Sequence, residues 1–252
     1  MQAATVRLQP AGAVAIELVG TLYLPDAAAA VPFPGLVVGH GAGSRRARHE
    51  SFCREACAQG FAVLGLDFRG HGDSGGAADG PLEDDILAAA GFLREHPAVD
   101  GDRICYRASS MGGFYGLKAA ATGGFAALAL LCPAGEQVML DGLEDVQRTE
   151  PEQSGASPTR WDIPSVKAYF LRQDSLGLAA AVRCPVLLIH ARGDDVVPLS
   201  HSLELARHLG GDATLVALAG GSHTSAQHDP GIHRLTTRWL LDQLTNAYTG
   251  RT

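Results

Sequence analysis

The sequence predicts an α/β fold: a mostly parallel sheet with helices covering both of its faces. From residue 35 onward, short apolar runs alternate with helical patterns, which is the rhythm of strand–helix–strand units. Several of the runs are apolar throughout, as expected for strands buried on both faces. The chain has 252 residues, 46% hydrophobic and 19% charged, a balance typical of a globular protein. We therefore expect one domain spanning residues 1–252.

The expected strands are rich in β-branched and aliphatic residues. An N-terminal hairpin of residues 5–8 and 13–24 surrounds a turn at Pro10 and Gly12. The strands that follow are residues 35–39, 61–67, 103–106, 126–132, 186–190 and 214–218.

The expected helices show apolar residues on one face and end at recognisable stop signals. Gly60 ends the first, because glycine accommodates the left-handed cap, and Pro97 stops the second. The helices are residues 47–59, 82–95, 114–121 and 199–209, followed by a last one in which Ile232, Leu235 and Trp239 share a face.

Residues 135–182 interrupt this alternation with a polar stretch that contains several prolines. About 45 residues cannot bury much core alone, so we expect a lid inserted into the domain and not a second domain. The apolar side chains of the lid either line an acyl or aryl pocket or pack the lid against the core. The candidate substrate-binding residues are Met139, Leu143, Trp161, Tyr169 and Phe170.

Charge and composition exclude several classes of protein. The net charge is −7, and no basic face is visible that could neutralise nucleic-acid phosphates. The one basic cluster, Arg45, Arg46 and Arg48, is expected to be a solvated helix start. No apolar run reaches the roughly 18 residues of a membrane span, and no leader segment suggests export. Five cysteines, an odd number, are expected to pack in the core of a cytoplasmic protein without binding a metal.

Ser110 is the candidate nucleophile, at a sharp turn between an expected strand and an expected helix. The backbone of such a turn is strained, so the residues two positions to either side must be very small. Ser110 meets this rule with Ala108 and Gly112, whereas Ser109 has arginine and methionine at the same positions.

A serine needs a base that takes its proton, and histidine has a pKa suited to this role. Of the ten histidines, His223 follows the last expected strand in a flexible, glycine-rich turn. We favour it over His228, which begins the last helix and suits a cap or a surface role. His40 and His71 lie in glycine-rich turns and are expected to brace loops.

The histidine in turn needs a carboxylate that fixes its tautomer. Asp194 and Asp195 both follow the strand that ends at His190; we favour Asp194 and keep Asp195 as an alternative. Sites in parallel sheets lie beyond the carboxyl ends of the strands, where each of these candidates falls.

A tetrahedral intermediate also needs fixed hydrogen-bond donors. The backbone amide of Met111 begins the helix after Ser110, where the dipole favours an anion. The second donor is expected from the glycine-rich loop after the first parallel strand, at Ala42. No lysine follows this loop at the position that a phosphate site would require.

Four segments resemble signatures of the α/β-hydrolase superfamily, in the same order along the chain. They are His-Gly-Ala-Gly at 40–43, Asp-Phe-Arg-Gly-His-Gly-Asp-Ser at 67–74, Ser-Met-Gly-Gly at 110–113 and His-Ala-Arg-Gly-Asp-Asp-Val-Val-Pro at 190–198. The chain looks most like the serine esterase branch that includes feruloyl or cinnamoyl esterases, monoacylglycerol lipases and dienelactone-hydrolase-like proteins. Alanine replaces a usual glycine at positions 108 and 191, which departs slightly from the pattern.

The resemblance implies an α/β-hydrolase fold with an inserted lid and a Ser-His-Asp triad: Ser110 as nucleophile, His223 as general base and then acid, and Asp194 as its orienting partner. We expect a serine hydrolase that cleaves small carboxylic esters through an acyl-enzyme, with no cofactor. Two alternatives remain: a peptidase or amidase that uses the same triad, and a binding protein that has lost catalysis. The acyl group, the alcohol and the oligomeric state are left open.

Overall fold

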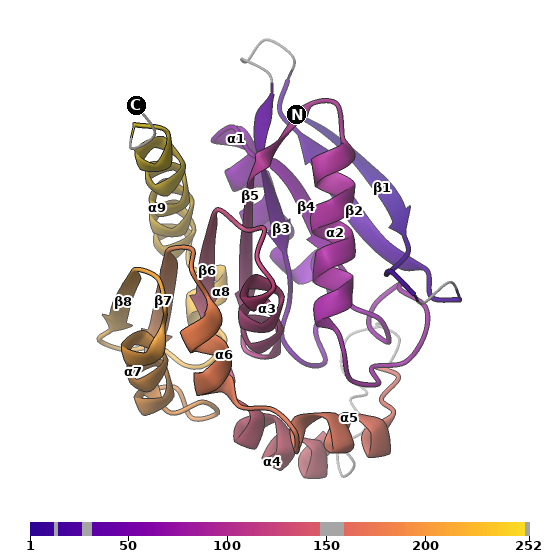
Figure 1. Ribbon diagram of the computed structural model, residues 1–252, viewed down its shortest axis with the longest axis vertical. Coiled ribbons are helices and arrows are strands. Elements are labelled where there is room, and N and C mark those ends of the chain that lie inside the picture. The colour runs from indigo at the N-terminus through magenta and orange to yellow at the C-terminus, as the bar shows by residue number, and fades with distance from the viewer. Residues whose placement is uncertain (13–14, 27–31, 147–158, 250–252) are drawn as a thin grey trace.

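The computed structural model describes residues 1–12, 15–26, 32–146 and 159–249 (Figure 1). Its centre is an eight-stranded sheet in the order β1-β2-β4-β3-β5-β6-β7-β8. The strands are β1 (Gln2–Leu8), β2 (Leu18–Leu24), β3 (Phe33–Val38), β4 (Ala62–Leu66), β5 (Val99–Ser109), β6 (Ala127–Leu131), β7 (Val186–Ala191) and β8 (Ala213–Leu218).

The direction of the strands confirms the expected topology. β1 and β2 form the N-terminal hairpin, paired antiparallel from Gln2 with Leu24 to Leu8 with Leu18, and β2 pairs antiparallel with β4. Every other neighbouring pair, from β4 through β3 to β8, is parallel. The parallel strands therefore bring their carboxyl ends to one edge of the sheet, where ligand sites form in such folds.

Helices lie on both faces of this sheet (Figure 1). They are α1 (Glu50–Ala58), preceded by a short 3₁₀ turn at Arg46–His49, then α2 (Glu83–Glu95), α3 (Met111–Ala121), α4 (Glu136–Val146), α5 (Ile163–Phe170), α6 (Ser175–Ala181), α7 (Leu199–His208), α8 (Ser225–His228) and α9 (Pro230–Thr249). None of the described helices has both the length and the apolar character that crossing a membrane requires.

Alternate side chains of the strands divide the core in two. On β6, Ala127, Ala129 and Leu131 pack with residues of α1 and α9, whereas Leu128 and Leu130 pack with residues of α2 and α3 on the opposite face. This follows from the period of two in a strand. It also explains the continuous apolar runs of the sequence, since burying each leucine stabilises the fold by about 1.5–3 kcal/mol. All five cysteines are free, and four of them are buried.

The region expected to form the lid contains α4, α5 and α6, while residues 147–158 lie outside the described part of the chain. α4 and α5 lie together at the lower edge of the molecule in Figure 1. α6 instead packs against α3 and α7, so the last part of this region belongs to the helical layer over the sheet.

Buried polar contacts attach α5 to the core. The Tyr169 hydroxyl donates to Glu83 Oε2 of α2 at 2.7 Å. Lys118 of α3 donates to the same hydroxyl at 2.8 Å and lies 3.0 Å from Glu83 Oε1. Beside them, the ring of Phe170 packs on Phe114, with ring centroids 5.1 Å apart. Burial raises the pKa of Tyr169 far above its usual range, so this hydroxyl stays protonated and keeps donating.

We expect Tyr169→Phe to lower the free energy of unfolding by about 1–3 kcal/mol, because it removes the donor to Glu83 Oε2 and one acceptor of Lys118. Urea denaturation measures the change. Leu171→Ala, two residues away at a side chain that is 65% exposed, is the control and should change stability by less than about 0.5 kcal/mol. Equal stability of the two variants would show that the hydroxyl does not anchor α5.

Candidate active site

Ser110 forms the sharp turn between β5 and α3. Its backbone has φ 50° and ψ −122°, a conformation that L-residues rarely adopt. The surrounding chain holds it there: the amide of Ser110 donates to the Leu131 carbonyl at 3.0 Å, and its carbonyl accepts from the amides of Gly113 at 2.8 Å and Ala134 at 3.1 Å. Such a strained residue costs on the order of 1–3 kcal/mol and persists only where its neighbours fix it.

The turn is crowded, as the rule of small flanking residues requires. A Cβ on Gly112 would lie 2.6 Å from the carbonyl oxygen of His40 and 3.0 Å from the Cβ of Ala108. A Cβ on Gly113 would lie 2.7 Å from the Cβ of Pro133. The two glycines after Met111 are therefore needed for space, because the backbone of neighbouring segments passes directly against α3.

His223 and Asp194 form a hydrogen-bonded pair beyond β8 and β7. The Nδ1 atom of His223 lies 2.8 Å from Oδ2 of Asp194, whose side chain is completely buried. The other carboxylate oxygen accepts the amides of Val196 at 2.9 Å and Val197 at 2.8 Å. The structure thus brings together the favoured acid and the favoured base.

These donors explain the charge state of Asp194. Burial alone would raise its pKa, but the amides of Val197 and Val196, the His223 ring and the Cys132 thiol all donate to the carboxylate and hold its pKa below the usual value. A carboxylate that stays ionised can fix the tautomer of His223 and stabilise its charged form.

The two alternative residues lie elsewhere. The side chain of Asp195 is exposed. The ring of His228 stacks on the ring of His49, with centroids 5.9 Å apart. In the described part of the chain, neither shares a hydrogen bond with Asp194 or His223.

The glycine-rich loop after β3 lies against Ser110. A Cβ on Gly41 would be 3.3 Å from the Cβ of Ser110, so the loop backbone passes within contact distance of the turn. Ala42 follows in this loop and is exposed. Met111 is the first residue of α3, so its amide has no acceptor within the helix. Both amides therefore remain candidate donors for an oxyanion.

Two histidines brace these loops. His40 Nδ1 lies 2.8 Å from the Gly41 carbonyl, and its Nε2 accepts the Phe68 amide at 3.2 Å. Burial lowers the pKa of His40 to about 4 and that of His71 to about 3, so both are neutral near pH 7. The His71 ring contacts the His40 ring, and the edge of half-buried Trp161 lies against it, with ring centroids 5.2 Å apart.

The five candidate substrate-binding residues lie in two settings. Met139 and Leu143 of α4 are buried, and half-buried Trp161 packs against the same core cluster near the His40 loop. Tyr169 and Phe170 have the core contacts described above. For these two, the structure favours packing against α3, the alternative that the sequence left open.

One group of described side chains has the residue types of a metal site. Ligand atoms of Cys132, Asp194 and His223 all lie within 4.8 Å of one another. However, the 2.8 Å between His223 Nδ1 and Asp194 Oδ2 is the length of a hydrogen bond, so these two side chains already satisfy each other. We interpret the group as an acid–base pair with a neighbouring thiol, whose pKa burial raises to about 12.

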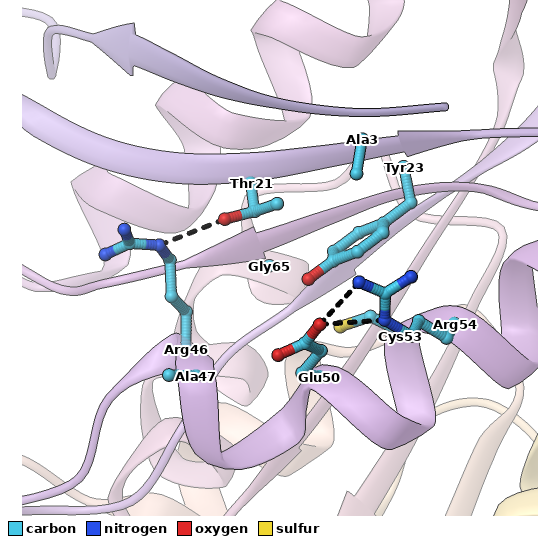
Figure 2. A pocket seen from close by; sticks show the side chains of 9 residues that line it. All are labelled: Ala3, Thr21, Tyr23, Arg46, Ala47, Glu50, Cys53, Arg54 and Gly65. Carbon is cyan, nitrogen blue, oxygen red and sulfur yellow. Dashed lines mark hydrogen bonds and ion pairs between the residues drawn. The ribbon is translucent and has the colours of Figure 1, made fainter. Parts of the chain in front are cut away.

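A cavity of about 200 Å³ lies elsewhere, between α1 and strands β1, β2 and β4 (Figure 2). Its two arginines already have partners: Arg54 donates to Glu50 at 2.7 Å, and Arg46 pairs with Asp67 and Asp73. The expectation that Arg46 is solvated was wrong, because its guanidinium fastens the turn after β4. No residue of the candidate site lines this cavity, and its charges are balanced.

Sequence reasoning missed three residues beside the site. Cys132 follows β6, so the strand-end rule could have placed it next to Asp194. Gln227 and Arg107 gave no comparable signal. The Ser109 hydroxyl donates to Gln227 at 3.0 Å, and Arg107 donates to the Gln227 carbonyl at 3.1 Å, across 118 and 120 residues of sequence.

Known proteins resemble this chain in sequence. The sequence profile of the prolyl oligopeptidase family matches residues 47–247. The uncharacterized peptidase YtmA of Bacillus subtilis is 30% identical over 156 residues, 60% of this chain and 59% of that protein. The quorum-quenching protein AidA of Acinetobacter baumannii is 34% identical over 119 residues, 44% of this chain and 38% of that protein. The matches thus span less than two thirds of the length of these two relatives.

Solved structures show the same fold. Est1E from Butyrivibrio proteoclasticus, solved with ferulic acid bound, superposes with a TM-score of 0.75 at 21% identity and covers 95% of this chain and 99% of its own. This likeness confirms the α/β-hydrolase fold.

We expect Gly112→Ala to lower the free energy of unfolding by about 1–3 kcal/mol, because the new methyl group would displace the backbone at His40. Gly91→Ala in α2 is the matched control. A Cβ there meets nothing within 4 Å, so alanine should leave stability unchanged or raise it by up to about 1 kcal/mol. Urea denaturation compares the two, and a Gly112→Ala variant as stable as the control would contradict the crowded turn.

Proposed function

The chain belongs to the prolyl oligopeptidase family and is a hydrolase of the α/β fold, and we propose that it cleaves carboxylic esters through an acyl-enzyme formed on Ser110. The observation that carries the proposal is the strained backbone of Ser110 at the start of α3, at the same edge of the sheet as the hydrogen-bonded pair of His223 and Asp194. Strain of this kind presents a serine hydroxyl above the sheet, where a base can reach it.

In the first half of the proposed reaction, Ser110 Oγ attacks the ester carbonyl and its proton passes to Nε2 of His223. Asp194 holds the Nδ1 proton and stabilises the imidazolium. The amides of Met111 and Ala42 donate to the oxyanion, and one such donor typically stabilises a transition state by about 3–4 kcal/mol. The imidazolium then protonates the leaving alcohol as the carbon–oxygen bond breaks.

In the second half, a water molecule replaces the alcohol. His223 takes a proton from this water, whose oxygen attacks the acyl carbonyl. The second tetrahedral intermediate collapses, the proton returns to Ser110 Oγ, and the carboxylic acid leaves. Each proton that His223 accepts is therefore given back, and the reaction requires water as its only co-reactant.

Est1E, the structural neighbour solved with ferulic acid, supports an ester with an aryl or acyl group as the substrate. We propose that Trp161, Met139 and Leu143 form the apolar side of the pocket, with Trp161 against His71, whose ring contacts that of His40. Tyr169 and Phe170 contribute by fixing α5 to the core.

A peptidase or amidase is the second candidate. Two observations favour it: the family is named for oligopeptidases, and the relative from Bacillus subtilis is called a peptidase. The same serine, histidine and aspartate would serve both reactions, so the substrate and not the acid–base chemistry separates the two functions.

We expect Ser110→Ala to abolish turnover of p-nitrophenyl esters and reaction with a fluorophosphonate probe. Asp194→Asn should lower kcat by a factor on the order of 10⁴, because the amide cannot hold the reactive tautomer of His223. Asp195→Asn, at the exposed neighbour, is the matched control and should stay within about twofold of wild type. Probe labelling at a residue other than Ser110 would refute the assignment of the nucleophile. Equal losses of kcat in Asp194→Asn and Asp195→Asn would refute the assignment of the acid. Ligand binding without turnover in both wild type and Ser110→Ala would instead indicate a binding protein.

We also expect an ester of an aromatic acid, such as methyl ferulate, to be hydrolysed with a kcat/KM at least about 100-fold above that of an aminoacyl anilide, because an amine is a poorer leaving group than an alcohol. Spectroscopic assays of both substrates measure the ratio. A preference for the anilide would establish the peptidase candidate in place of the esterase.

A further inference from the structure

The loop that carries His223 connects β8 to α8 and is largely exposed. Contacts within the loop and with α8, such as Ser222 with Ser225 at 2.9 Å, shape it locally. Within the described part of the chain, two hydrogen bonds hold His223 itself: the ring to Asp194 at 2.8 Å, and its carbonyl to the side chain of Gln227 at 3.2 Å. The first fixes the ring, and the second fixes the main chain that carries it.

Gln227 is buried, and both ends of its side-chain amide are hydrogen-bonded. Its Nε2 donates to the His223 carbonyl at 3.2 Å, and its Oε1 accepts the hydroxyl of Ser109 at 3.0 Å. The orientation of the amide is determined by its partners, because a carbonyl can only accept and therefore faces the nitrogen. The side chain thus connects the base loop to the residue that precedes the nucleophile.

The main-chain carbonyl of Gln227 is held by side chains of β5 and α9. Its carbonyl accepts Nη2 of Arg107 at 3.1 Å and Nε2 of His233 at 2.8 Å. Arg107 is completely buried on β5, and its other hydrogen-bond partner is the neutral ring of His49 at 3.1 Å. Its guanidinium also lies 4.3 Å from the centroid of the Phe52 ring. Burial lowers the pKa of Arg107 to about 10, so it remains a cation near neutral pH.

We propose that Gln227 is a positioning residue of the hydrolase site: it clamps the main chain of His223 to the strand that carries Ser110, through Ser109 on one side and Arg107 on the other. The inference rests on the proposed function. A serine and its base must stay within hydrogen-bond reach, and a displacement of about 1 Å can cost 10²-fold in rate. Ser109 and Arg107 lie one and three residues before Ser110. The clamp therefore connects the loop that carries His223 to β5, the strand that leads directly into Ser110.

The test compares Gln227→Leu with Gln173→Leu. Both remove a glutamine amide that makes two hydrogen bonds, since half-buried Gln173 donates to the Tyr169 carbonyl at 3.0 Å and accepts Lys118 at 3.0 Å. We expect Gln227→Leu to lower kcat by about 10- to 100-fold with KM within about twofold, whereas Gln173→Leu keeps kcat. Ser109→Ala, a smaller change, should lower kcat by less, and adding it to Gln227→Leu should cost nothing further, because both remove one connection.

A second readout does not depend on turnover. The Nδ1 proton of His223, held against Asp194, should give an NMR signal that disappears in His223→Ala and exchanges with water at least about tenfold faster in Gln227→Leu than in wild type or Gln173→Leu. Unchanged kcat and unchanged exchange in Gln227→Leu would overturn the proposal. If wild type hydrolyses no substrate, the proposed function fails, and the exchange rate still decides whether Gln227 positions His223. If Gln227→Leu does not fold, Ser109→Ala decides the question. A Ser109→Ala variant with the same kcat and the same exchange rate as wild type would overturn the proposal.

Discussion

The site depends on one backbone constraint, the positive φ of Ser110. A side chain in this conformation is strained, so every segment around it must be small or must hold it by hydrogen bonds. Gly112 leaves room for the His40 loop, and Gly113 leaves room for Pro133. The end of β6 and the segment between β6 and α4 bond to the main chain of Ser110 itself. The candidate oxyanion loop passes against the same turn, because a Cβ on Gly41 would lie 3.3 Å from the Cβ of Ser110. The backbone strain at Ser110 and the close packing of the candidate site therefore depend on each other.

A second constraint is the buried charge of Arg107, on the face of the sheet that α1 and α9 cover. Arg107 places a cation in a dry core, and among the described residues no carboxylate pairs with it. An unpaired buried charge is costly, so its neighbours must be good acceptors or aromatic faces. His49 stays neutral, Phe52 offers its ring, and the Gln227 carbonyl accepts a strong, charge-assisted hydrogen bond. The guanidinium of Arg107 thus holds α8, the helix that follows the loop carrying His223.

The sequence was sufficient for the fold and for the pairing of Asp194 with His223, because both depend on local patterns. Apolar runs with helices between them predicted the parallel sheet, and the strand-end rule brought Asp194 and His223 to one edge. The contacts of Tyr169 with Glu83, of Arg46 with Asp67 and of Gln227 with Ser109 could not be predicted in the same way. Each joins polar side chains from segments far apart in the chain, and an isolated polar residue has no period or spacing that reveals its partner. Whether Trp161 and its neighbours contact a substrate stays a prediction.

The way the base loop is held bears on the choice between esters and amides. An alcohol can leave as its carbon–oxygen bond breaks with proton transfer still incomplete, whereas an amine must be protonated before the carbon–nitrogen bond breaks. Cleavage of an amide therefore requires His223 to sit more accurately between the nucleophile and the leaving group. His223 lies in an exposed loop with one bond to its ring and one to its carbonyl. Loss of either hydrogen bond would therefore slow amide cleavage more than ester cleavage. In the proposed mechanism, ester cleavage tolerates a looser hold on His223 than amide cleavage, which would depend more strongly on the clamp at Gln227.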